Sequence, residues 1–180
     1  MLPEIKSILY CTDLSKNASY AFKYAAYLAK QTGAQIHMLH VVEKLSSDAR
    51  ITLQTYVMSA KARDEFINHR IDHANDLLKQ RQDYFWDVLA PTEKAIRSQI
   101  ASIDVVEHYP AESILKKSKE LNVDLIIMGA HEKGIMHTFL GSVAKSVLRR
   151  SRIPTMIVPL PEKDELKRQK EQRKNILPAG

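Results

Sequence analysis

The fold class is decided by residues 124–159, DLIIMGAHEKGIMHTFLGSVAKSVLRRSRIPTMIVP. This stretch opens on an uninterrupted apolar run, Leu125 to Met128, which is typical of a central parallel strand covered on both faces. A loop containing glycines follows, and then a predicted helix from Ser142 to Arg150 and a predicted strand from Thr155 to Val158. Strand, helix and strand in this order indicate part of a parallel α/β sheet.

The same alternation is present near the start of the chain. Lys6 to Tyr10 form a short apolar run that predicts a strand, and Gln35 to Val42 predict another. Between them, Ala18 to Gln31 carries apolar residues at helical spacing, with Asn17 placed to cap its start and Gly33 to end it. The short connections are typical of a parallel crossover.

A further strand and helix lead into the deciding segment. Ile103 to Glu107 predict the strand, and Ala111 to Leu121 predict a helix whose apolar face is formed by Ile114, Leu115 and Ser118. The whole pattern therefore has five strands alternating with about four helices. It predicts a doubly wound five-stranded parallel sheet of the α/β class.

The middle of the chain, residues 45–99, is polar and contains no glycine, and we predict that it is mostly helical. Pro91 is expected to stop or kink this helix. Residues 46–62 have a weaker period and fit either a loop or an extra helical turn. The predicted amphipathic face consists of Phe66, Ile67, Ile71, Ala74, Leu77 and Leu78.

Length and composition favour one compact domain, residues 1–160, followed by a charged tail, residues 161–180. The net charge is +6, but acidic residues interrupt the basic tail, so we expect no nucleic-acid partner. No stretch reaches the about 18 apolar residues of a membrane span, and we expect no membrane partner. The single cysteine, Cys11, lies in an apolar strand and is predicted to be buried filler. A cytoplasmic protein follows from these features.

The loop after the fourth predicted strand is the candidate functional element. Gly129, Gly134 and Gly141 are three of the five glycines in the chain. Glycine lets backbone N–H groups approach an anion closely, and the helix beginning at Ser142 and Val143 could place its N-terminus on a phosphate. Turn-forming glycines and a serine that caps a helix are an ordinary alternative.

The chain resembles the universal stress protein family. The resemblance rests on residues 124–159, on ILYCTDLS at 8–15, on HVV at 40–42 and on YPAESILKKSKELNVDLIIMG at 109–129, in the order of the family. In that family a strand ending in Met-Gly leads into Gly-x2-Gly-x9-Gly-Ser/Thr. The resemblance implies an adenine nucleotide alpha hydrolase-like fold, which is Rossmann-like, and a homodimer paired through the C-terminal edge strand.

For ATP-binding members, the resemblance implies how the site residues divide their roles. Asp13 would bond the ribose or adenine side, while Thr12 and Val42 frame the base. His131 would lie near the phosphates, and Mg²⁺ would be bound beside the phosphates. The remaining positions that carry over are Met128 and Gly129 as the floor, with Gly141, Ser142 and Val143 as phosphate donors.

The loop departs from the family pattern at two points. Glu132 stands where the second motif glycine is expected, and eight residues rather than nine separate it from Gly141. A carboxylate near a polyphosphate repels it unless a metal ion or Lys133 compensates. The family also includes members that do not bind ATP and have a degraded loop. The departures therefore favour the alternative function, a dimeric interaction module without nucleotide that docks through the middle helix or the tail.

Histidines elsewhere suggest no catalytic or metal site. His69 and His73 have a spacing that can hold zinc, but no partner motif accompanies them, and His37 and His40 are expected to be satisfied or edge-exposed. Asp13 and His131 are the only general-base candidates, and a capping role accounts for Ser142. We therefore predict an adenine-nucleotide-binding regulatory protein of the stress response, with at most slow ATP hydrolysis.

Overall fold

Five parallel strands form one sheet in the order β3-β2-β1-β4-β5. The structure is a computed structural model that describes residues 2–15, 18–57, 59–130 and 140–159. The doubly wound five-stranded sheet predicted from the sequence is confirmed, and β5 is an edge strand. The strands are β1 (Ser7–Thr12), β2 (Gln35–Glu43), β3 (Ile100–His108), β4 (Leu125–Gly129) and β5 (Thr155–Val158).

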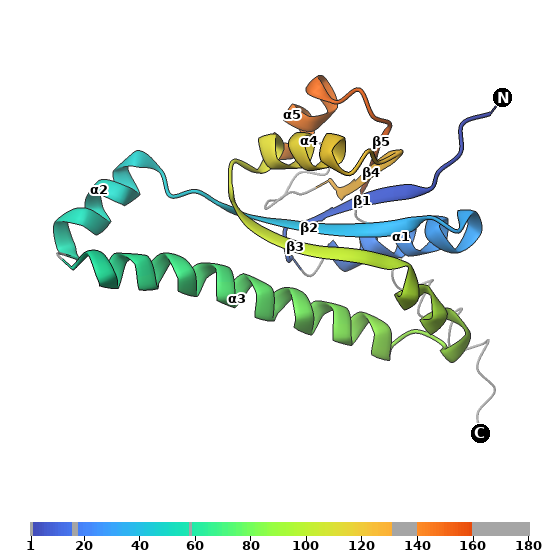
Figure 1. The fold of residues 1–180 in the computed structure, drawn as a ribbon, viewed down its shortest axis with the longest axis horizontal. Coiled ribbons are helices and arrows are strands. Elements are labelled where there is room, and N and C mark those ends of the chain that lie inside the picture. The colour runs from blue at the N-terminus through green and yellow to red at the C-terminus, as the bar shows by residue number, and fades with distance from the viewer. Residues whose placement is uncertain (1, 16–17, 58, 131–139, 160–180) are drawn as a thin grey trace.

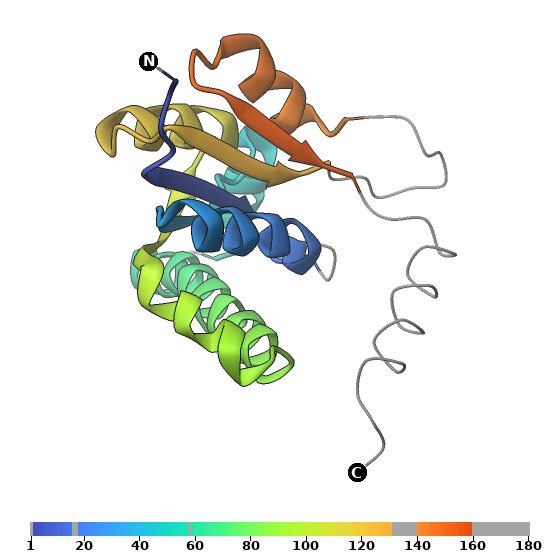
Figure 2. The same cartoon turned by 90° about the vertical axis from the view of Figure 1, so that its right-hand side faces the viewer.

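Helices cover both faces of the sheet (Figure 1). On one face lie α1 (Ala18–Thr32) and α3 (Ala60–Asp87), and on the other lie α4 (Pro110–Glu120) and α5 (Ser142–Arg150), as Figure 2 also shows. Alternate residues of the central strands point into the two resulting cores: Ile127 packs beside α1 and α3, whereas Ile126 packs beside α4 and α5. The apolar run of β4 is therefore buried on both faces, as its sequence predicts.

Helix α1 begins and ends close to its predicted bounds. Alanines make up most of its buried face, which lets the helix backbone lie close to the sheet. Gly33 ends the helix with φ +73°, and its N–H donates to the carbonyl of Ala29 over 2.8 Å, as a left-handed C-cap requires. The predicted cap Asn17 lies outside the described residues. The predicted buried face of α4, formed by Ile114, Leu115 and Ser118, is confirmed.

The middle segment contains α2 (Ser47–Tyr56), α3 and a short 3₁₀ segment, η1 (Pro91–Gln99). Residues 46–62 are thus partly helical, and the Ser46 hydroxyl caps α2 by accepting from the N–H of Ala49 over 3.2 Å. No residue of α2 is buried, and this helix lies beyond the ends of the strands (Figure 1). Pro91 does not kink α3; it opens η1 after α3 has ended.

The predicted apolar face of α3 is wrong at its first turns. Phe66 is 47% exposed, because this part of the helix extends past the sheet together with α2 and has no core beneath it (Figure 1). The buried residues of α3 are Ala74, Leu78, Phe85 and Trp86. β3 also begins earlier than predicted, at Ile100, which pairs with Ile36. Within the described parts of the chain, no helix is both long enough and apolar enough to cross a membrane.

Candidate functional site

A cavity of about 660 Å³ opens at the carboxyl ends of the strands. It lies where the strand order reverses, since β1 is joined to β2 on one side and is hydrogen-bonded to β4 on the other. Open α/β sheets bind ligands at this point, and the volume falls in the range of small-molecule sites. Every predicted site residue within the described parts of the chain lines this cavity. His131, Glu132 and Lys133 lie outside the described residues.

The turn after β1 supplies Thr12 and Asp13. The Thr12 hydroxyl accepts from the N–H of Leu14 over 3.1 Å, and the Asp13 carboxylate accepts from the N–H of Ser15 over 2.9 Å. Leu14 adopts φ +60°, which is unusual for a residue with a branched side chain, and its side chain is buried. The polar side chains of this turn are therefore held at the cavity mouth by local hydrogen bonds and by the buried side chain of Leu14.

The floor of the cavity is apolar where β2 and β4 end. Val42 and Met128 are buried there, and Gly129 continues the floor after Met128 without a side chain. Beside Val42, His40 places Nδ1 2.8 Å from the carbonyl oxygen of Thr12. A carbonyl only accepts, so Nδ1 carries the proton of the neutral ring. This bond ties the end of β2 to the turn after β1.

Helix α5 begins at the cavity with Gly141, Ser142 and Val143. Gly141 occupies the N-cap position, and among the described residues no side chain caps the helix. The predicted capping role of Ser142 is therefore wrong: this residue is the first of the helix, and it is exposed. The first N–H groups of a helix have no partner within it, so the start of α5 presents hydrogen-bond donors and the positive end of the helix dipole.

One wall of the cavity was not anticipated from the sequence. Arg70, His73, Ala74 and Leu77 of α3 line it, spaced by three, four and seven residues along one helix face. The helical period of Ala74 and Leu77 was visible in the sequence. Its position over the strand ends was not, because that position depends on where a long helix crosses the sheet.

A family model supplies the assignment of the chain. The model of the universal stress protein family matches residues 4–159. The chain belongs to the universal stress protein family. This membership is consistent with the order of the strands and helices and with the position of the cavity.

Individual universal stress proteins are similar to this one over most of their length. Universal stress protein MJ0577 from Methanocaldococcus jannaschii is 29% identical over 157 residues, which cover 85% of this chain and 94% of that protein. Universal stress protein G from Salmonella typhimurium is 27% identical over 139 residues, covering 77% and 86%. The solved structure of UspA from Lactobacillus plantarum has a TM-score of 0.64 at 22% identity, covering 87% of this chain and 99% of that one, which shows a shared fold.

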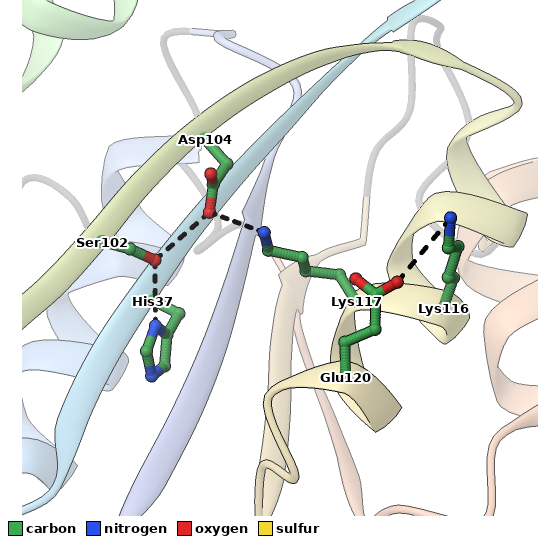
Figure 3. A network of polar contacts seen from close by, with 6 residues as sticks. All are labelled: His37, Ser102, Asp104, Lys116, Lys117 and Glu120. Carbon is green, nitrogen blue, oxygen red and sulfur yellow. Dashed lines mark hydrogen bonds and ion pairs between the residues drawn. The ribbon is translucent and has the colours of Figure 1, made fainter.

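Away from the cavity, His37 belongs to a polar network that joins β2, β3 and α4 (Figure 3). His37 Nδ1 lies 2.9 Å from the hydroxyl oxygen of Ser102, which donates to Asp104 over 3.2 Å. Lys117 of α4 lies 3.2 Å from the same carboxylate. Both strand histidines are thus hydrogen-bonded, and neither is on an edge strand. Cys11 is buried as predicted, and burial raises the pKa of its thiol.

The two histidines of β2 make the stability of this universal stress protein depend on pH. Burial lowers the pKa of His37 and of His40 below the ordinary value of 6.5, against the opposing effects of Asp104 on His37 and of Thr12 and Asp13 on His40. The unfolded chain therefore binds protons more readily than the folded chain as the pH falls through 6.5. We expect the free energy of unfolding to decrease over this range and below it.

Urea unfolding at several pH values measures this effect. The variant His40→Gln should give a shallower dependence of the free energy of unfolding on pH, since one of the two contributing groups is gone. An equal slope for His40→Gln and for the wild-type protein would contradict the prediction.

Proposed function

We propose that this universal stress protein binds an adenine nucleotide, ATP in the first place, in the cavity at the strand ends, and acts as a regulatory protein of the stress response. One observation carries the proposal: the Asp13 turn and the start of α5, with Gly141 at its N-cap, line the same cavity. A carboxylate suits ribose hydroxyls, and a helix N-terminus suits phosphates. The apolar floor between them, with Val42 and Met128, suits a nucleobase.

The residues divide between the two ends of the nucleotide. Thr12 and Val42 frame the base, Asp13 bonds the ribose or adenine side, and Gly129 lets the ligand approach the strand end. Ser142 and Val143, with Gly141 before them, donate to the phosphates. His131, which lies outside the described residues, is proposed beside them from the resemblance alone.

Charge in the cavity supports a role for Mg²⁺. Its described lining holds the carboxylates of Asp13 and Glu43, whereas the one guanidinium, that of Arg70, is paired with Glu107. A triphosphate would meet little free positive charge from these side chains. Mg²⁺ held by the phosphates would supply the positive charge that these side chains lack.

The assembly and its setting complete the proposal. β5 has four residues and leaves one edge of the sheet without a partner strand in the described chain, and an isologous pairing of two copies would cover it. We therefore propose a cytoplasmic homodimer built from the domain of residues 1–160. The tail, residues 161–180, is proposed as a separate charged segment.

Release of bound nucleotide tests the proposal directly. Freshly purified protein, once denatured, is expected to release an adenine nucleotide that ultraviolet absorbance and ion-exchange chromatography identify, because a nucleotide held at cellular concentrations survives purification when it dissociates slowly. Titration calorimetry with ATP and Mg²⁺ on the stripped protein is the second measurement. If neither released nucleotide nor binding heat is detected, the proposal is overturned and the alternative function without nucleotide is favoured.

That alternative is a dimeric interaction module without nucleotide. The observation that favours it is α2, whose residues are all outside the core, with Ile51 and Tyr56 exposed by 60% and 82%. A helix of this length is marginal alone in water, so a contact with a second copy of the chain would stabilise it. Under this alternative, the nucleotide-free protein would be dimeric, and mutation of Tyr56 to lysine would weaken the dimer in light scattering.

A further inference from the structure

Arg70 joins α3 to the ends of two strands. Its Nη2 donates to the backbone carbonyl of Glu43, the last residue of β2, over 2.7 Å. Its Nη1 lies 3.5 Å from the carboxylate of Glu107 on β3. Glu107 is the register partner of Val42, so both contacts lie beside the strand end that forms the cavity floor. One planar guanidinium thus spans α3, β2 and β3.

The ion pair with Glu107 is partly shielded from water, whereas the hydrogen bond to Glu43 is exposed. The side chains of Arg70 and Glu107 are 24% and 18% exposed. A partly buried ion pair contributes little net stability, because removing the two charges from water offsets much of their attraction. The pair is therefore better explained by the geometry that it holds than by the stability that it adds.

Along α3, Arg70 is also the first residue that fixes the helix to the sheet. All buried residues of this helix, Ala74, Leu78, Phe85 and Trp86, come after Arg70 in the chain, and no residue between Ala60 and Arg70 is buried. The cavity wall begins at the same residue. The distance between this end of the wall and the floor at Val42 therefore depends on the contacts of Arg70 with Glu43 and Glu107.

We propose that Arg70 is a positioning residue that sets the width of the base end of the cavity. The inference rests on the proposed function, in which the base lies at Val42 and the phosphates at the start of α5. Arg70 touches neither end of the nucleotide in this assignment. Its Nη1 is buried and makes no hydrogen bond within the described residues, so it faces Glu107 as an ion pair only. Arg70 acts through the strand end and the helix that its guanidinium holds together.

The experiment compares ATP with inorganic tripolyphosphate, which reaches only the phosphate end. Arg70→Met combined with Glu107→Gln removes the contact without leaving a buried unpaired carboxylate, and Glu107→Gln alone keeps the bond to the Glu43 carbonyl. By titration calorimetry with Mg²⁺, the double variant should bind ATP roughly tenfold more weakly than the wild type. Its affinity for tripolyphosphate should stay within about twofold, and Glu107→Gln alone, which keeps one of the two contacts, should lose less ATP affinity than the double variant.

The outcomes separate this inference from the proposed function. A wild-type protein that binds no ATP overturns the proposed function, and this inference falls with it. If the wild type binds ATP, then unchanged ATP affinity in the double variant, or an equal loss for both ligands, overturns the positioning role alone. Should the double variant fail to fold, Arg70→Lys gives the same comparison, since an ammonium cannot span both acceptors as the guanidinium fork does.

Discussion

Replacing Gly141 with aspartate is expected to lower the affinity for ATP by about 100-fold. Gly141 occupies the N-cap of α5 and lines the cavity, so the new carboxylate would lie beside the phosphates of a bound nucleotide. Like charges a few ångströms apart in a partly buried site repel strongly. Titration calorimetry with ATP and Mg²⁺ measures the loss.

The fold should survive this substitution. The φ of Gly141 is −58°, which any residue adopts, and aspartate is a favoured N-cap residue that should stabilise α5. Gly141→Asn is the matched control, because asparagine has the same shape and capping ability without the charge. Equal ATP affinities in the aspartate and asparagine variants would show that no anion binds at this helix start.

Most of the sheet could be predicted because its residues carry the signal themselves. The run Leu125 to Met128 is apolar at every position because β4 is covered on both faces, and Ile8 to Cys11 of β1 has the same pattern for the same reason. The helix face of α3 could be predicted only in part. Phe66 has the right spacing but no sheet beneath it, and Arg81 interrupts the apolar pattern one turn before the buried pair Phe85 and Trp86.

The residues of the candidate site could also be predicted only in part from the sequence. Thr12, Val42 and Gly129 could be grouped from the sequence, because parallel strands all end at one edge of a sheet. Arg70 could not be added to them, since no local pattern tells which face of a long helix crosses the strand ends. The predicted cap of α5, Ser142, was one residue too late in the chain, because Gly141 and Ser142 are both acceptable cap residues.

Truncation of Phe22 to alanine is expected to lower the free energy of unfolding by about 3–5 kcal/mol. Phe22 of α1 is buried, and its ring centroid lies 5.0 Å from that of Tyr10, 4.6 Å from that of Phe85 and 5.8 Å from that of Trp86. These rings come from β1 and from the end of α3. The substitution would remove the centre of the cluster and leave a cavity among three elements.

Urea unfolding followed by far-ultraviolet circular dichroism measures this change, and Trp86, the one tryptophan of the chain, reports on the cluster itself. Tyr27→Ala on the same helix is the control, since Tyr27 is 60% exposed and its loss should cost no more than about 0.5 kcal/mol. Similar losses in the two variants would contradict the packing described for Phe22. Because Phe85 and Trp86 attach the far end of α3 while Arg70 attaches its middle, Phe22→Ala should chiefly lower stability, whereas loss of the Arg70 contact should chiefly lower affinity.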